Sequence, residues 1–240
     1  MAGIKQIKRA REQNTPVKRK PSKQTALKSK PDTWLNNVID EHLTGVMTPP
    51  RSGVFHPSTL SNSCDKAVWL TFHGHMTTSK LEPTLNRIFQ NGSFLEKRVE
   101  SWLANLGILL GSEIPVKNDN PSMSGRIDFL IKHEEYKVLP VELKSINTNG
   151  FAKLSGPKKE HKAQLQMYLN MGNFDMGTVL YENKNDQQIK SFLLERDETE
   201  WNRIIERCFN IQAMSEPPLR CTGAFWCACR SVDMEKINAR

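Results

Sequence analysis

The sequence predicts an α/β fold, in which helices flank a central sheet, on the basis of two observations. First, three patterns typical of β-strands follow one another along the chain, at residues 108–116, 124–132 and 138–146. Second, these strands lie between two patterns of helical spacing, a long one from about 84 to 106 and a later one in the segment WNRIIERCFNIQAM. A chain of 240 residues, 38% hydrophobic and 25% charged, can bury one sizeable core with appendages.

The N-terminal segment differs in composition from the rest of the chain. Residues 1–30 hold ten Lys and Arg and a single acid, whereas the remainder holds 24 basic and 25 acidic residues and is close to neutral. Because the segment offers almost no large apolar side chain, we predict that residues 1–31 form a disordered basic arm. Such an arm attracts phosphate backbones without reading sequence. A solubilising tail and an organellar transit peptide are the alternative interpretations.

The apolar runs of the chain are short. None approaches the roughly 18 residues of a membrane span, and the N-terminus lacks the apolar core of a secretory signal. We therefore expect a soluble, cytoplasmic protein without a membrane partner.

The folded part is expected to begin with a helix and a linker over residues 32–54. The segment DTWLNNVIDEHL places its apolar residues at helical spacing, and Gly45 follows its end. Two prolines and a glycine between residues 49 and 53 then indicate a loop. The next segment, HPSTLSNSCDKAVWLTFHG, predicts a loop that enters a short helix, with Cys64 near the start of that helix.

The long helix is predicted to run from about Thr84 to Leu106, and Gly107 ends it. It carries Glu96 on a stripe that we expect to be buried and that includes Leu85, Phe89, Gly92, Val99, Leu103 and Leu106. A buried acid is costly unless it is paired or binds a metal. Either Glu96 has such a partner or the helix turns it toward water, and both alternatives stay open.

Charged residues interrupt two of the predicted strands. Asp128 stands among the apolar residues of SGRIDFLIK, and Glu142 and Lys144 project from one face of VLPVELKSI because strand side chains alternate. An isolated Glu-x-Lys is usually an ion pair on a solvated face. Together with Glu96, however, the carboxylates would repel one another unless a divalent cation lay among them, and oxygen ligands suit Mg²⁺ or Mn²⁺.

These residues resemble the motifs of the PD-(D/E)xK nucleases, in particular the RecB-like exonuclease branch that includes phage exonucleases and iron-sulfur CRISPR adaptation nucleases. GRIDFLI supplies the motif aspartate as Asp128, and VELKS supplies Glu142 and Lys144. HKAQLQMYL resembles the Q-x-x-x-Y helix of the branch, and NGSFLEKRVE resembles its G-x-x-x-H helix, with Glu96 where that branch often has histidine. The resemblance covers roughly residues 55–230.

The resemblance implies a mixed central sheet with a restriction-endonuclease-like core. It implies that one or two Mg²⁺ or Mn²⁺ ions lie among Glu96, Asp128, Glu142 and the backbone carbonyl of Leu143. Lys144 would then assist the attacking water. From the helix that follows, Gln164 would hold Lys144 or a phosphate, and Tyr168 would contact substrate or pack in the core.

The five cysteines indicate thiols or a metal centre, because the rest of the sequence is typical of an intracellular chain. In the iron-sulfur members of the branch, one cysteine before the nuclease core joins three near the C-terminus around a four-iron, four-sulfur cluster. Here the resemblance assigns those places to Cys64, Cys221, Cys227 and Cys229. The spacing C-x5-C-x-C departs from the C-x2-C-x5-C common in that branch, so a structural Zn²⁺ and ordinary buried thiols are the alternatives. Cys208 is expected in the core.

We therefore expect a metal-dependent deoxyribonuclease that acts as an exonuclease on DNA ends or single strands in a bacterial or phage-infected cell. Recombination, repair or phage DNA metabolism is the expected setting, with a recombination or replication protein as a possible partner. The alternatives are a non-catalytic nucleic-acid-binding or assembly subunit that keeps the fold, and a structure- or site-specific endonuclease. The nuclease domain is expected over residues 55–230, followed by a tail at 231–240.

Overall fold

The structure is a computed structural model, and it describes residues 33–62, 64–221 and 227–232. The chain divides into two compact units, Met1–Ile39 and Asp40–Arg240. The predicted basic arm lies outside the described residues. Helix α2, Thr33–Leu43, begins the described part, close to the helix expected from DTWLNNVIDEHL. No helix in the described part of the chain has the length and apolar character needed to cross a membrane.

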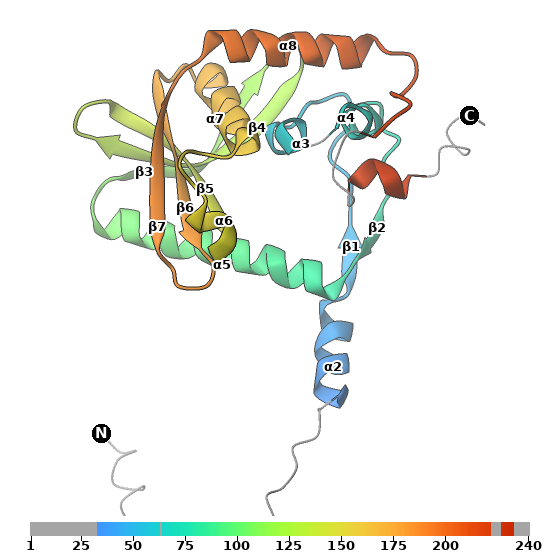
Figure 1. Cartoon of the computed structure of the whole chain (residues 1–240), viewed down its shortest axis with the longest axis horizontal. Coiled ribbons are helices and arrows are strands. Elements are labelled where there is room, and N and C mark those ends of the chain that lie inside the picture. Colours follow the sequence, from blue (N-terminus) through green and yellow to red (C-terminus); the bar gives the residue numbers. More distant parts are fainter. Residues whose placement is uncertain (1–32, 63, 222–226, 233–240) are drawn as a thin grey trace, which may run out of the picture. The chain divides into compact units, whose positions relative to one another are not determined.

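The second unit is built on a five-stranded sheet in the order β3-β4-β5-β6-β7 (Figure 1). Its strands are Leu109–Asn118, Met123–His133, Lys137–Ile146, Met176–Asn183 and Ile189–Glu195. Strands β5 and β6 pair in parallel and the other neighbours pair antiparallel, so the sheet is mixed. A parallel pair needs a crossover, and α6 (Thr148–Ala152) and α7 (Lys159–Met171) supply it. The predicted α/β class with a mixed, helix-flanked sheet is confirmed.

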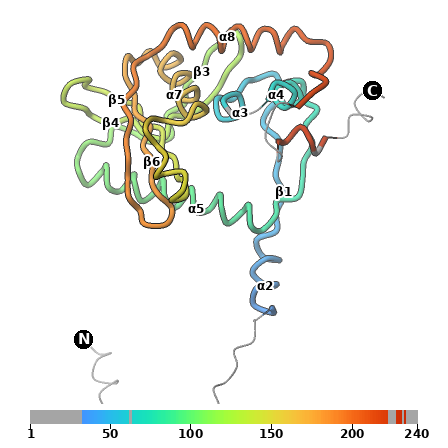
Figure 2. Tube along the Cα trace, in the orientation of Figure 1, coloured from blue at the N-terminus to red at the C-terminus, as the bar shows by residue number. Residues whose placement is uncertain are grey.

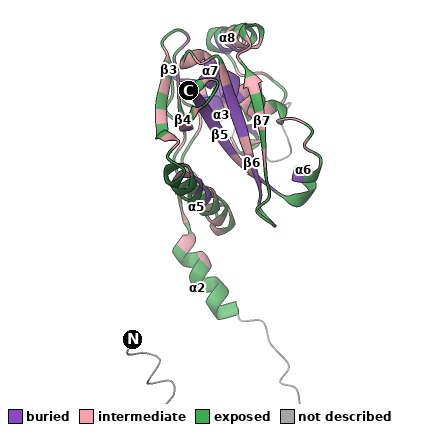
Figure 3. Cartoon of the chain, turned by 90° about the vertical axis from the view of Figure 1, so that its left-hand side faces the viewer, coloured by how far each residue is buried: buried purple, intermediate pink, exposed green. Residues whose placement is uncertain are grey.

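Helices α5 (Pro83–Asn105) and α7 cover opposite faces of the sheet. Leu95 and Val99 of α5 pack with Phe129, Val141 and Leu143, while two leucines of α7 pack with β6 and the end of β5. Because strand side chains alternate, Glu142 and Lys144 lie on the α7 side of β5. Figure 3 shows the buried residues concentrated along β5 and β6, between these helices.

A third cluster of buried residues joins segments from both ends of the unit. Helices α3 (Pro57–Asn62), α4 (Asp65–Phe72) and α8 (Glu198–Ala213) pack with the short 3-10 helix η1 (Ala228–Ser231). The indole Nε1 of Trp69 donates to the carbonyl of Met214 at 2.9 Å. Figure 2 shows how the chain returns from α8 to the neighbourhood of α4. Near this cluster in sequence, β1 (Gly45–Met47) pairs antiparallel with β2 (Ser79–Leu81).

The predicted strands and helices agree with the structure within a few residues, but the expected buried stripe of α5 is wrong. Only Leu95 and Val99 of this helix are buried, whereas Phe89 is 49% and Leu106 is 70% exposed. Glu96 is exposed as well, so the helix turns it toward water rather than into the core. The reason is geometric. The helix contacts the sheet over only a short central stretch, so apolar residues before and after that stretch stay exposed to solvent.

Candidate active site

The charged strand residues lie where β4 and β5 separate. The two strands pair from His133 and Lys137 up to Phe129 and Val141. Beyond that point β4 continues beside β3, while Glu142 pairs with Val179 of β6. The sheet therefore opens into a fork, and its first residues on either side are Asp128 and Glu142.

The Asp128 side chain provides a hydrogen-bond acceptor at the point where β5 loses its pairing with β4. Its Oδ2 accepts a hydrogen bond from the backbone N–H of Leu143 at 2.7 Å. Without this carboxylate the N–H would lose its acceptor at the point where the ladder ends. The bond also fixes the direction of the carboxylate between the two strands.

Glu142 is a buried carboxylate with little to stabilise its charge. It is 1% exposed and forms an ion pair with Lys144, whose side chain is 24% exposed. Apart from this pair, neither carboxylate oxygen accepts a hydrogen bond among the described residues. A buried charge with free lone pairs is costly, and a bound cation would satisfy them.

The pKa values of the three acids reflect this crowding. Burial first, and then the charge of Glu142, raises the pKa of Asp128 well above its usual range, although the Leu143 N–H opposes the shift. Burial raises the pKa of Glu142, with Lys144 acting against it. Burial and the nearby Glu113 raise the pKa of Glu96. A divalent cation would reverse these shifts, because it favours the ionised carboxylates.

A cavity of about 770 Å³ opens at the fork. Both Asp128 and Glu96 line it, so the exposed helix acid predicted from sequence reaches the same space as the strand acid. Glu113 and Arg126 line it too and form an ion pair at 2.6 Å. The cavity thus gathers acids from one helix and two strands around an opening to solvent.

Gln164 and Tyr168 lie on α7, on the Glu142 side of the sheet. The Nε2 of Gln164 donates to the Tyr168 hydroxyl at 3.0 Å. Tyr168 also lines the cavity, and burial raises the pKa of its hydroxyl. Its ring packs tightly on β4: a Cβ added to Gly125 would lie 2.7 Å from Cε1 of the ring. Gln164 therefore orients Tyr168 here, while its predicted contact with Lys144 or a phosphate stays a prediction.

Known structures share this architecture. The alkaline exonuclease LHK-Exo from Laribacter hongkongensis is 16% identical with a TM-score of 0.51, and the match covers 68% of this chain and 88% of that one. The chain therefore shares the fold of this alkaline exonuclease. No family model and no curated protein sequence matches the chain.

Two further structures resemble the chain less closely. The complex of LHK-Exo with dAMP gives 17% identity and a TM-score of 0.47 over 67% of this chain and 87% of that one. The protein SSO0001 gives 19% identity and a TM-score of 0.49 over 76% of this chain and 85% of that one.

Within this exonuclease fold, the sequence motifs fall around one place. Asp128, Glu142 and Lys144 flank the fork, Glu96 reaches its cavity, and Leu143 presents its backbone between the two strand acids. The side chain of Leu143 is buried in the core, so only its carbonyl is a candidate ligand, and this remains a prediction.

Sequence reasoning missed Glu113 and Arg126. Arg126 could have been found, because it stands two residues before Asp128 on the same strand and therefore on the same face. Glu113 could not be found in this way, because an acid is an ordinary residue for the solvent-facing side of a strand with alternating polar and apolar residues. Its backbone takes a left-handed conformation, with φ of 53°, which a sequence pattern does not disclose for a residue other than glycine.

His161 on α7 was also missed. Its Nδ1 lies 2.7 Å from the Tyr181 hydroxyl, which accepts a hydrogen bond from the Lys158 N–H. Burial, with Lys144 as the second cause, lowers the pKa of His161 to about 4. The ring is therefore neutral at pH 7 and adds no charge beside Lys144.

The four cysteines assigned by resemblance meet in space. The sulfur atoms of Cys64, Cys221, Cys227 and Cys229 all lie within 4.8 Å of one another, although the first is about 160 residues from the rest. The Sγ of Cys64 is 3.5 to 3.7 Å from the other three. Cys208, by contrast, is fully buried in the helical cluster, as expected.

The geometry and chemistry of this cysteine cluster fit a metal centre. Four thiolates at about 2.3 Å from one ion would be separated by about 3.8 Å in a tetrahedron, close to the observed spacing. A four-iron, four-sulfur cube would need the sulfurs farther apart, because each binds a different iron. Burial and the neighbouring thiols raise the pKa of Cys229, so metal binding there must displace protons.

Proposed function

We propose that this protein is a divalent-metal-dependent nuclease that hydrolyses DNA phosphodiester bonds as an exonuclease. The observation that carries the proposal is the buried Glu142 carboxylate beside Asp128 at the strand fork, with Lys144 paired to it and an acid-lined cavity in front. A structural role alone would not favour charges whose pKa values are raised by burial.

The donor set fits a hard cation. Asp128, Glu142 and the Leu143 carbonyl would hold Mg²⁺ or Mn²⁺, with Glu96 reaching it from α5. When bound, such an ion polarises the scissile phosphate and stabilises the leaving oxyanion. Lys144, which is partly exposed and next to Glu142, would orient the attacking water by donating a hydrogen bond.

Arg126 would have a supporting role in this reaction. Its guanidinium lies in the same cavity as Asp128 and is held by Glu113. Guanidinium groups bind phosphate oxygens in pairs, so Arg126 would contact a DNA phosphate that enters the cavity.

The cysteine cluster would hold a structural metal, either a four-iron, four-sulfur cluster or a single Zn²⁺. The four cysteines come from the segment before the nuclease core and from the C-terminal segment. The thiols need not approach the phosphate, so the centre would act on stability. DNA is the proposed partner, and the basic N-terminal arm would add affinity that is independent of sequence.

A non-catalytic DNA-binding subunit is the competing function, and the acids argue against it. Glu96, Glu113, Asp128 and Glu142 would repel phosphate at the cavity without a cation, so a binding module gains nothing from them. An endonuclease would use the same fork, and the ends of the products distinguish it from an exonuclease.

The proposal is tested by incubating the protein with end-labelled and internally labelled DNA, with and without Mg²⁺ or Mn²⁺. Asp128→Ala and Lys144→Ala should each lower divalent-dependent cleavage about a hundredfold or more. Asp119→Ala and Lys117→Ala are matched controls, because both side chains are exposed and neither lines the acidic cavity. Cleavage by the two fork variants at the rate of the controls would refute the assignment.

A further inference from the structure

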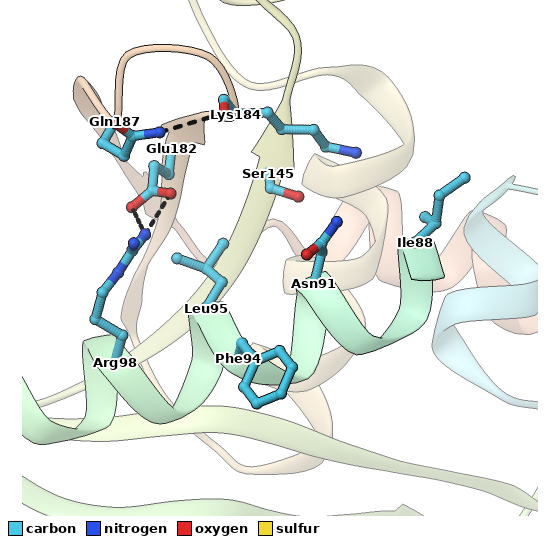
Figure 4. A pocket seen from close by; sticks show the side chains of 9 residues that line it. All are labelled: Ile88, Asn91, Phe94, Leu95, Arg98, Ser145, Glu182, Lys184 and Gln187. Atoms are coloured by element: carbon cyan, nitrogen blue, oxygen red, sulfur yellow. Dashed lines mark hydrogen bonds and ion pairs between the residues drawn. The ribbon is translucent and has the colours of Figure 1, made fainter. Parts of the chain in front are cut away.

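A second cavity lies on the other side of α5 from the acidic cavity. It measures about 480 Å³, within the range of small-molecule sites. Five α5 residues that include Asn91 and Phe94 line it, together with Ser145 at the end of β5 and residues at the end of β6 and in the turn between β6 and β7 (Figure 4). We call it the α5 pocket.

The α5 pocket adjoins the fork on two elements at once. On β5, Lys144 belongs to the fork and the next residue, Ser145, lines the α5 pocket. On α5, Glu96 lines the acidic cavity and the preceding residue, Leu95, lines the α5 pocket. Helix α5 therefore contributes residues to both cavities and lies between them.

Gly92 leaves α5 open between the cavities. It follows Asn91, which lines the α5 pocket, and precedes Ser93, which lines the acidic cavity. A Cβ added to Gly92 would meet no heavy atom within 4 Å. Glycine inside a helix costs about 1 kcal/mol relative to alanine, and packing does not explain it here.

Some polar groups of the α5 pocket are paired within the protein. Glu182, which is buried, is neutralised by Arg98, whose Nη2 lies 2.5 Å from both carboxylate oxygens. This leaves the ammonium of Lys184, for which the described residues provide no ion pair. Figure 4 shows the Asn91 amide pointing toward Ser145, with the Lys184 side chain extending past them.

An exposed aromatic ring also belongs to the lining of the α5 pocket. Phe94 lines the α5 pocket and is 67% exposed, so its ring is accessible to a ligand. A stacking ring, an amide that can bond a base edge, and a free ammonium together match the parts of a nucleotide.

We propose that the α5 pocket binds one nucleotide of a DNA single strand whose neighbouring phosphodiester lies at the fork. The base stacks on Phe94, Asn91 contacts its edge, and Lys184 takes the phosphate. The strand passes α5 at Gly92. In a duplex the base faces are stacked on one another, so the pocket selects single strands. This inference rests on the proposed nuclease function and adds the preferred substrate form.

The binding test uses a 5′-fluorescein-labelled twelve-residue oligothymidylate in Ca²⁺, where anisotropy reports binding. Phe94→Ala should weaken binding about tenfold, since stacking is worth about that factor per base. Lys184→Gln should weaken it and lower the salt dependence by about one phosphate contact. Phe89→Ala and Lys153→Gln are the controls, because Phe89 is exposed on the same helix and both residues lie outside the pocket lining.

A second measurement tests the path past α5. Gly92→Leu should keep or raise thermal stability, because the position is open and leucine favours helix. It should nevertheless raise KM for single-stranded DNA in Mg²⁺ about tenfold or more, while Gly156→Leu, also at an open position, should not.

The outcomes separate this inference from the proposed function. Wild-type cleavage combined with unchanged binding by Phe94→Ala and Lys184→Gln would overturn the α5 pocket and leave the nuclease in place. Equal losses in the control variants would overturn it too, because the effect would then be a property of the whole surface. Absence of wild-type cleavage would refute the nuclease, while the binding measurement in Ca²⁺ would still decide the α5 pocket.

Discussion

Asp128 and Glu142 bring two carboxylates together, and the described residues give them one backbone N–H donor and one ammonium as partners. Burial is the largest cause of the raised pKa of both. A folded state with raised carboxyl pKa values binds protons more readily than the unfolded chain, whose carboxyl pKa values lie near 4. Stability from these groups is therefore greatest at low pH and is lost as pH rises through the raised values.

Replacing Asp128 by asparagine should stabilise the protein at pH 7 in Mg²⁺-free buffer, by about 1 to 2 kcal/mol. The amide oxygen can still accept the Leu143 N–H, but the buried charge is gone. The difference from wild type should shrink as pH falls, because protonation removes the buried charge of Asp128. Urea unfolding at several pH values measures it.

Added Mg²⁺ provides the matching control. It should raise the unfolding free energy of wild type but not of Asp128→Asn, because a ligand stabilises only the state that binds it. A variant less stable than wild type at pH 7 would contradict the view that this acid is strained in the metal-free protein.

At the scale of single residues, the sequence predicted the acids that break strand patterns, and the structure brings them together. Asp128 could be predicted because it is a charged residue within an otherwise apolar strand pattern. Glu113 could not be found, because its place in the cavity depends on a backbone conformation and on the pairing of β3 with β4. The α5 pocket likewise depends on which turns of α5 meet the sheet.

Among the elements, β4 lies close to both α3 and α7 beside the fork. Gly125 allows this approach: a Cβ there would lie 2.7 Å from the Tyr168 ring and 2.9 Å from Cγ of Pro57. The absence of a side chain in β4 thus sets the position of Tyr168 in the cavity.

Substituting Gly125 by alanine should destabilise the protein by about 1 to 3 kcal/mol through overpacking. It should also lower cleavage, since Tyr168 and β4 must move apart beside Asp128. Gly156→Ala is the control, because a Cβ at that position meets nothing within 4 Å. Denaturant unfolding measures the stability of Gly125→Ala, and the cleavage assay measures its activity. If both are unchanged from wild type, the packing argument is wrong.

At the same scale, the strands β3 to β5 and the helix α7 could be predicted because each has a distinct pattern and a motif. The strands β6 and β7 were not predicted. The buried side of α5 was predicted wrongly because apolar residues such as Phe89 and Leu106 extend around and beyond the part that meets the sheet. Periodicity alone does not reveal where along a 23-residue helix the contact falls.

For the whole molecule, the cysteine cluster connects the start of α4 to the C-terminal segment. Cys64 is the N-cap residue of α4, and its Sγ accepts a hydrogen bond from the Ala67 N–H at 3.4 Å. The same sulfur atom therefore caps the helix and belongs to the cysteine cluster. A metal bound by four thiolates would close a loop of about 160 residues and restrict the unfolded chain.

Replacing Cys227 by alanine should therefore lower the unfolding temperature of the whole domain and release metal. Leu219→Ala, a 95% exposed residue of the same segment, should do neither. Elemental analysis and absorbance identify the metal: iron with a broad band near about 400 nm, or one zinc per colourless chain. Freshly prepared folded protein with neither metal would end the proposal.

The basic arm makes a separate prediction for the whole molecule. Deleting residues 1–30 removes a net charge of nine and should flatten the salt dependence of DNA binding, because fewer counterions are released. Binding measured at several salt concentrations gives the slope. An identical slope for the full chain and the truncated one would favour targeting or solubility as the role of the arm.

The central claim is that the strand fork holds a divalent cation between the strand acids, and anomalous diffraction from crystals soaked in Mn²⁺ tests it most directly. We expect a peak at roughly 2.0 to 2.3 Å from a carboxylate oxygen of Asp128, one of Glu142 and the Leu143 carbonyl. The peak should vanish in Glu142→Gln, whose amide keeps the shape and loses the charge. A well-ordered fork without a peak, or a Mn²⁺ ion bound only elsewhere, would contradict the account.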